Sequence, residues 1–218
     1  EMASPILGTA NPYLGIYAKP DGIYLRIIAR GASREEAQGL LAPLEKTLRK
    51  VFADSIWGVD AETPQEVIGT LLRQRGLTLA TMESCTGGLL ASAITDVPGS
   101  SAYFHGGIVA YTNDLKVASG VDIALIRQHG AVSLEVAEAM AHAARQRFHA
   151  DFGIGVTGVA GPESLEDIPP GTVYIGVASE GQQQSALHRF PSGNRTLVKN
   201  RAVVSALLAL RQALESET

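Results

Sequence analysis

The sequence predicts an α/β fold: a three-layer α/β/α sandwich with a mixed sheet, preceded by a small α+β domain. In residues 61–218, apolar runs typical of strands alternate with runs of helical periodicity, which indicates an α/β layered domain. The last two predicted strands, 172–178 and 185–190, follow each other with no helix between them, so they could pair directly in a mixed rather than purely parallel sheet. Residues 1–60 read differently and predict a separate unit of marginal size.

In the first unit, residues 1–12 show no clear period, and we expect an extended arm. Residues 22–30 are rich in branched and aromatic side chains and predict a strand. Ser33 is expected to cap a helix that continues to Val51, with a kink or break at Pro43. Residues 56–59 could form a closing strand.

In the second unit, Thr63 caps a helix that begins at Pro64 and ends at Gly76. Further helices are expected over 87–95, 113–119, 122–129, 133–148 and 194–214, with Asn113 or Asp114 as the cap of the second of these. Strands are expected over 77–82, 105–111, 152–157, 172–178 and 185–190.

Composition limits the function classes. The chain has 218 residues, a net charge of −4 and one cysteine, so it can bury a core but cannot form an internal disulfide. No long basic block favours nucleic acid, and no signal peptide is visible. The longest apolar stretch, Ala202 to Leu210, is too short to span a bilayer. We therefore expect a cytoplasmic protein with no membrane or nucleic-acid partner.

The run from Glu83 to Gly88 follows a buried strand and opens a helix, the place where α/β sheets bind ligands. Hydroxyls, free amides and two glycines there would suit an anion or an oxyanion. The alternative is ordinary helix capping by Ser84 or Thr86. Cys85 could be a nucleophile at the helix N-terminus, but we expect a small residue packed under the loop.

Two further segments carry hydroxyl and amine groups. Ser101, after Pro98 and Gly99, is either a loop nucleophile or part of a turn. Lys116 follows Tyr111 and Asn113, and a lysine near a tyrosine and a serine can serve as a base if burial lowers its pKa. The alternative is a surface lysine on a solvated helix.

The segment from Gly153 to Gly158 matches GxGxxG in letters, but its glycines fall within a strand and no helix follows, so we reject a dinucleotide loop. Thr157 and Gly158 end that strand and are expected to line the same pocket. Arg195, at the start of the last helix, could clamp a phosphate or carboxylate, or be solvated. The five histidines show no metal-ligand spacing, and we predict neither metal nor cofactor.

Taken in order, these motifs resemble the C-terminal domain of CinA, the competence-damage-inducible protein related to nicotinamide-nucleotide amidases. Residues 1–60 resemble the small KH-like middle domain of CinA, notably at Asn11-Pro12 and 25–27. The blocks that carry the first resemblance are 83–88, 99–101, 106–116, 130–133 and 156–162.

The resemblance implies hydrolysis of the carboxamide of nicotinamide mononucleotide to nicotinate mononucleotide and ammonia. The amphipathic helices of the sequence would suit a homodimer. It implies Ser101 as nucleophile, activated by Lys116 and Tyr111, with Ser84 as the rival nucleophile. The implied substrate-binding residues are Glu83, Ser84, Thr86, Gly87, Gly88, Asn113, Thr157, Gly158 and Arg195, the last on the phosphate. Full-length CinA also has an N-terminal domain with metal-dependent ADP-ribose pyrophosphatase activity, which we expect this sequence to lack.

One departure from the family leaves alternatives open. After Pro162 the family commonly has a glycine-rich stretch and then Lys-Pro, whereas this chain has 163–171 with the sequence ESLEDIPPG. A catalytically weak nucleotide-binding or scaffolding module is therefore one alternative. A thiol-dependent amidase using Cys85 with Glu83 and Lys116 is another, and a nucleotide-dependent oxidoreductase is a distant third.

Overall fold

The computed structural model describes residues 10–19, 21–191 and 193–216. The chain divides into two compact units, 1–59 and 60–218, and each is described by itself. Among the described residues, no helix is long and apolar enough to cross a membrane.

The first unit is a hairpin with a helix. Strand β1 (Tyr13–Lys19) pairs antiparallel with β2 (Gly22–Ile28), from Tyr13 opposite Ile28 to Lys19 opposite Gly22. Helix α1 (Arg34–Phe52) follows, and a short 3-10 turn, η1 (Ala53–Ser55), ends it. Strand β1 is not predicted from the sequence.

Three expectations for this unit need comment. The helix does not break at Pro43. Proline has no N–H, so the carbonyl of Gly39 loses its helical hydrogen bond, but both residues are exposed and water can bond to that carbonyl instead. Residues 56–59 form no strand; Trp57 instead packs edge-on against Tyr24, with ring centroids 5.6 Å apart. Most of the expected arm, residues 1–9, lies outside the described residues.

The second unit is built on a five-stranded mixed sheet. Its strands are β3 (Leu79–Glu83), β4 (Phe104–Val109), β5 (Phe152–Gly158), β6 (Thr172–Ala178) and β7 (Gln183–Arg189). Their order is β4-β3-β5-β6-β7; β3 runs parallel to both β4 and β5, and the other two pairs are antiparallel. The mixed sheet predicted from the sequence is confirmed.

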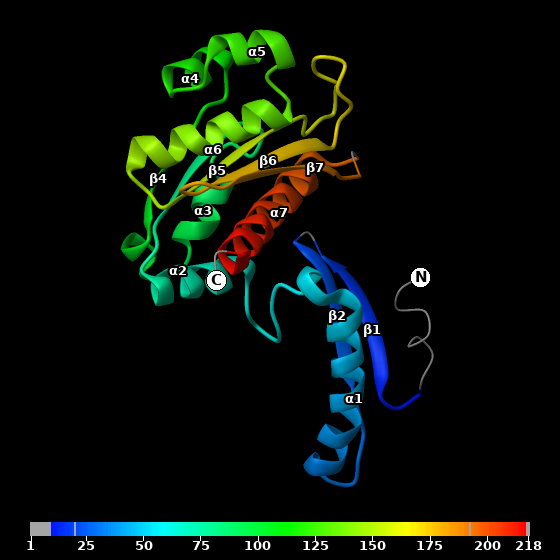
Figure 1. Cartoon of the computed structure of the whole chain (residues 1–218). Coiled ribbons are helices and arrows are strands. Elements are labelled where there is room, and N and C mark those ends of the chain that lie inside the picture. The colour runs from blue at the N-terminus through cyan, green and yellow to red at the C-terminus, as the bar shows by residue number, and fades with distance from the viewer. Residues whose placement is uncertain (1–9, 20, 192, 217–218) are drawn as a thin grey trace. The chain divides into compact units, whose positions relative to one another are not determined.

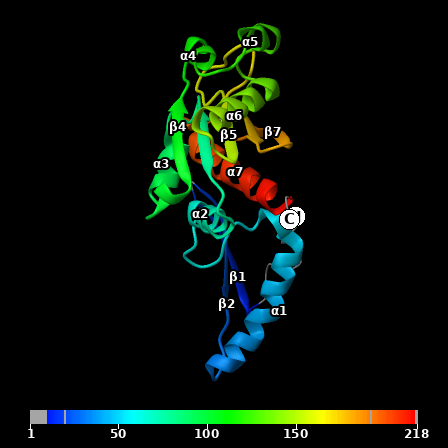
Figure 2. The same ribbon diagram turned by 60° about the vertical axis from the view of Figure 1, so that its left-hand side comes forward.

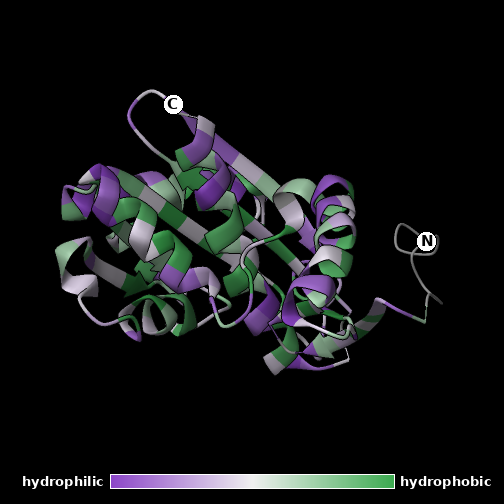
Figure 3. Ribbon diagram, turned by 90° about the horizontal axis from the view of Figure 1, so that it is seen from below, coloured by the Kyte–Doolittle hydropathy of each residue, from purple (hydrophilic) through white to green (hydrophobic). Residues whose placement is uncertain are grey.

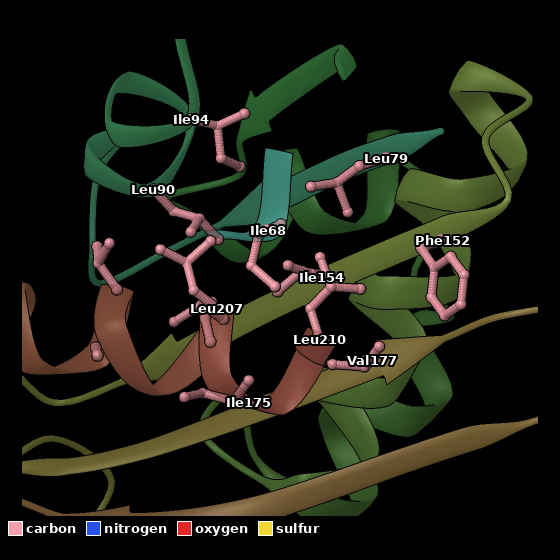
Figure 4. Close-up of a cluster of buried hydrophobic side chains, with 14 of the residues drawn as sticks. Ile68, Leu79, Leu90, Ile94, Phe152, Ile154, Ile175, Val177, Leu207 and Leu210 are labelled. Carbon is pink, nitrogen blue, oxygen red and sulfur yellow. The ribbon is translucent and has the colours of Figure 1, made fainter. Parts of the chain in front are cut away.

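Helices cover both faces of this sheet, as Figure 1 shows for α6 and α7. The helices of the second unit are α2 (Pro64–Arg75), α3 (Leu89–Thr95), α4 (Asn113–Ala118), α5 (Ile123–His129), α6 (Leu134–Phe148) and α7 (Arg195–Ser216). One core lies between the sheet and α2, α3 and α7; in Figure 4, Leu207 and Leu210 of α7 point toward Ile154 and Ile175. A second core joins the other face to α5 and α6. Along the helices in Figure 3, green and purple segments alternate, as expected where one side of a helix is apolar.

Glycines bring α6 directly onto the sheet. A Cβ at Gly153 would lie 2.0 Å from the carbonyl oxygen of Ala141, and one at Gly155 would lie 2.1 Å from that of Ala137. The first two glycines of the rejected GxGxxG match therefore face the α6 backbone, where a side chain does not fit, whereas a Cβ at Gly158 would meet the backbone of Thr172 and Val173.

Local signals set most helix ends. Thr63 and Glu66 form a capping box at α2, and Gly76 ends that helix in the left-handed conformation. Helix α4 is capped by Thr112, not by Asn113 or Asp114 as expected, since the Thr112 hydroxyl accepts from the Leu115 amide at 3.3 Å.

Candidate active site

The site lies at the carboxyl ends of two neighbouring strands. Because β3 and β4 are parallel, with Glu83 opposite Val109, the turn after β3 and helix α4 after β4 emerge at the same edge of the sheet. Figure 2 shows β4 leading toward α4. This register brings Lys116 to Ser84, and its Nζ donates a hydrogen bond to Oγ of Ser84 at 3.1 Å.

Lys116 is buried, with 3% of its surface exposed. Burial lowers the pKa of its amine, and the nearby Glu166 carboxylate partly opposes that shift. In the part of the chain that the structure describes, no carboxylate forms a salt bridge with Nζ. A lysine in this environment loses its proton more easily than a solvated one, and the neutral amine can then take the proton of the Ser84 hydroxyl.

Glu83, expected to bind substrate, is fully engaged with the protein. Its side chain is 1% exposed and accepts three backbone N–H groups at the start of α3: Gly88 and Leu90, both at 3.0 Å, and Ala91 at 2.8 Å. A carboxylate at a helix N-terminus satisfies the free amides there and interacts favourably with the helix dipole. Glu83 therefore holds the turn that carries Ser84.

The rest of that turn is shaped by glycine. Gly87 and Gly88 have φ of +64° and +91°, which side chains rarely adopt, and α3 begins at Leu89 rather than at Gly87. Thr86 is completely buried, and its hydroxyl has no hydrogen-bond partner among the described residues. Burial raises the pKa of the Cys85 thiol to about 12, so it stays protonated at neutral pH, as expected of a packing residue rather than a nucleophile.

Two basic side chains of α7, Arg195 and Lys199, lie near the segments that follow β3, β4 and β5. Arg195 donates to the Gly161 carbonyl at 2.7 Å and to the Tyr111 hydroxyl at 3.0 Å, which joins the segments after β5 and β4. Lys199, one helical turn later, has its Nζ 3.6 Å from where a Cβ at Gly87 would lie. Lys199 makes no hydrogen bond or ion pair within residues 10–19, 21–191 and 193–216.

Two of the remaining predicted binding residues lie at the carboxyl end of β5, beside the turn that carries Ser84, and the third lies on α4. Thr157 is 1% exposed and donates its hydroxyl to the Ala131 carbonyl at 2.8 Å, so it holds the segment before α6. Gly158 pairs with Val173 at the end of β5. Asn113 is exposed on the first turn of α4.

The structure does not bring Ser101 to Lys116. Ser101 is exposed in the 3-10 turn η2 (Ser100–Ala102), which precedes β4, whereas Lys116 follows that strand. The six residues of β4 separate the two ends by roughly 16 Å at the usual rise per residue. The expected pairing of Ser101 with Lys116 and Tyr111 is therefore corrected: the serine beside Lys116 is Ser84, the rival nucleophile.

Sequence reasoning missed two residues near the site. Lys199 was detectable, because a cation four residues after Arg195 lies on the same face of a helix. Glu166 was not, since it belongs to a loop without periodicity; its Oε2 accepts from the amides of Ala131 at 2.9 Å and Val132 at 3.3 Å.

Other candidate sites are weaker. A surface hollow of about 360 Å³ lies between α5 and α6, lined by residues that include Asp122, Gln128 and His142, and it contains none of the residues above. Within the described ranges, no group of three or more His, Cys, Asp or Glu side chains could hold a metal ion.

Comparison with known proteins agrees with this architecture. Residues 61–214 match the model of the CinA C-terminal domain, and residues 1–58 match that of the damage-inducible protein CinA KH domain. The chain belongs to the CinA family. The resemblance to CinA drawn from the motifs is thus confirmed over both parts of the sequence.

Relatives and solved structures are similar over different shares of the chain. A protein from Moorella thermoacetica that is named as a competence-damage inducible protein is 44% identical, over 100% of this chain and 53% of its own length. A CinA-like protein from Acaryochloris marina is 41% identical over 98% and 52%. This chain thus spans about half the length of the curated relatives it matches.

Crystal structures of CinA superfamily proteins are similar over 71% and 74% of this chain. A CinA superfamily protein from Klebsiella pneumoniae is 32% identical, with a TM-score of 0.68, over 71% of this chain and 99% of its own. A CinA superfamily protein from Escherichia coli is 35% identical, with a TM-score of 0.65, over 74% and 98%.

Proposed function

We propose that this chain hydrolyses the carboxamide of nicotinamide mononucleotide to nicotinate mononucleotide and ammonia. The observation that carries the proposal is the buried hydrogen bond between Lys116 and Ser84, in a domain whose family includes amidases of this kind. Amide hydrolysis needs a nucleophile with an adjacent base, and a serine beside a buried lysine supplies both.

In the proposed mechanism, Ser84 Oγ attacks the carboxamide carbon while neutral Lys116 takes the hydroxyl proton. Lys116 returns that proton to the leaving nitrogen, so ammonia departs and an acyl ester remains on Ser84. A water molecule then attacks the ester as Lys116 accepts its proton, and the Ser84 oxygen leaves with that proton to release the carboxylate. In the turn from Ser84 to Gly88, the amides of Ser84, Gly87 and Gly88 already donate within the protein, so the amides of Cys85 and Thr86 are the ones suited to stabilise the intermediate oxyanion.

The substrate phosphate is assigned to the cations of α7. Lys199 has no hydrogen-bond or ion-pair partner among the described residues and its Nζ lies near Gly87, and Arg195 is fixed by hydrogen bonds to Gly161 and Tyr111. Lys199→Met is expected to raise KM for the mononucleotide about tenfold or more with little change in kcat, and to leave the nucleoside, which lacks the phosphate, unaffected. Arg201→Met, two residues further along α7, is the matched control, since it points to another side of the helix.

The test of the reaction is ammonia release and nicotinate mononucleotide formation by the purified chain, without added metal. Ser84→Ala and Lys116→Met should each lower kcat by about 100-fold or more, because each removes one member of the pair. Ser101→Ala is the control on an exposed serine and should keep normal turnover. Near-normal turnover by Ser84→Ala would refute the assignment, and binding of the mononucleotide without ammonia release would favour a binding module.

A further inference from the structure

The loop between β5 and β6 places a carboxylate on two backbone amides. Oε2 of Glu166 accepts from the N–H groups of Ala131 and Val132, at 2.9 and 3.3 Å. These two residues are 5% and 3% exposed, so their amides lie below the surface. A Cβ at Gly130 would lie only 2.8 Å from the same oxygen, so the glycine leaves room for an acceptor there.

These amides are connected to the proposed nucleophile. The Ala131 carbonyl accepts from Thr157, and the carbonyl of Val156, the residue before Thr157, accepts from the Ser84 amide at 2.8 Å. Glu166 is also close enough to Lys116 to raise the pKa of its amine against the effect of burial. The carboxylate therefore lies near the Ser84–Lys116 pair.

Much of the loop that carries Glu166 is exposed. Residues 162–167 are exposed, and inside the loop a single bridge joins Leu165 to Ile168. Two adjacent N–H groups form a general site for oxyanions, whether carboxylate or phosphate. Glu166 satisfies them here with a group that chemically resembles the carboxylate product of the proposed reaction.

We propose that the amides of Ala131 and Val132 form an oxyanion subsite of the candidate active site, and that Glu166 fills it as an internal anion that a ligand must displace. The nature of the ligand rests on the proposed function, but the subsite does not. Displacement reduces apparent affinity, because only the fraction of molecules with the loop released can bind.

Binding of product and of inorganic phosphate, measured by calorimetry, tests this directly and needs no turnover. In Glu166→Gln, the neutral amide competes more weakly than the carboxylate, so we expect the Kd of nicotinate mononucleotide to fall roughly tenfold. For Glu166→Ala, the Kd of nicotinate mononucleotide should fall at least as far. Glu163→Gln, an exposed carboxylate in the same loop, is the matched control and should bind like the unaltered chain.

The two probes identify the group that enters the subsite. Tightening of nicotinate mononucleotide without tightening of phosphate assigns the subsite to the carboxylate, and tightening of both assigns it to oxyanions in general. Unchanged, weaker or undetectable binding of both probes by Glu166→Gln would overturn the proposal, because Glu166 would then only anchor the loop. If the unaltered chain releases no ammonia, the proposed function is refuted, but this binding test can still be interpreted.

Discussion

Replacement of Glu83 by glutamine removes one oxygen from a carboxylate that accepts three hydrogen bonds. The best glutamine orientation keeps its oxygen on Gly88 and Leu90 and turns the amide nitrogen toward the Ala91 N–H, a donor facing a donor. A hydrogen bond to a charged group contributes about 1.5–3 kcal/mol, and a buried donor left unsatisfied adds to the loss. We expect Glu83→Gln to lower the free energy of unfolding of the second unit by about 2–4 kcal/mol.

That loss should be visible as a melting shift. For a unit of this size, 1 kcal/mol corresponds to about 2–4 °C, so the Tm of the second unit should fall by about 5–15 °C in scanning calorimetry. Because Glu83 fixes the turn that carries Ser84, kcat for ammonia release should fall while KM stays within about threefold. Glu180→Gln, on an exposed turn between β6 and β7, should change neither. An unchanged Tm together with a raised KM would refute this reasoning and return Glu83 to a direct contact with substrate.

Three further predictions concern buried groups. Cys85→Ala should keep full amidase activity, since the thiol is protonated, and ammonia release checks it. Gly155→Ala should destabilise the second unit by about 1–3 kcal/mol in urea unfolding, because its Cβ meets the α6 backbone, whereas Gly193→Ala in open space should not. Burial lowers the pKa of His188 from 6.5, so the neutral ring stabilises the fold above that pH and this contribution is lost as pH falls below it. The variant His188→Phe keeps the stacking on Phe190 but cannot take up a proton. Its Tm should therefore drop less between pH 7 and pH 5 than the Tm of the unaltered chain.

Each of these has a contrary result. Loss of turnover in Cys85→Ala at unchanged Tm would favour the thiol-dependent mechanism. Equal unfolding free energies for Gly155→Ala and Gly193→Ala would show that α6 can move away from the sheet at little cost. An identical drop in Tm for His188→Phe and the unaltered chain would show that the acid sensitivity arises elsewhere.

The elements of the second unit were predictable because each carries a local signal. The capping box at Thr63, the apolar face of α6 and the continuous apolar run of β5 all act within a few residues of chain. Strand β1 was missed because Gly15 interrupts the alternation of polar and apolar side chains along it. The strand is defined by its pairing with β2, which a local pattern does not reveal. Strand β1 also carries exposed Tyr17, which gives no burial signal.

The site was only partly predictable, because its pairing depends on strand order. The sequence contains Ser84, Ser101 and Lys116 but does not say which serine shares an end of the sheet with the lysine. The parallel neighbours β3 and β4 decide this, since residues that follow both strands meet and a residue that precedes one does not. The roles of Glu83 and Glu166 depend on which amides lie within reach, and these belong to segments five to thirty-five residues away.

The position of β4 at the border of the sheet has a consequence for how the molecule would lose activity. Ser84 follows an interior strand, but Lys116 is attached to the border strand, which has a ladder partner on one side only. Border strands open locally at a lower free energy than the whole domain unfolds. Opening of β4 would carry the amine away from the hydroxyl while the interior strands stay paired, so on heating, turnover should cease before the core melts. Inactivation would then be reversible on cooling, with the border strand closing again as the step that restores it.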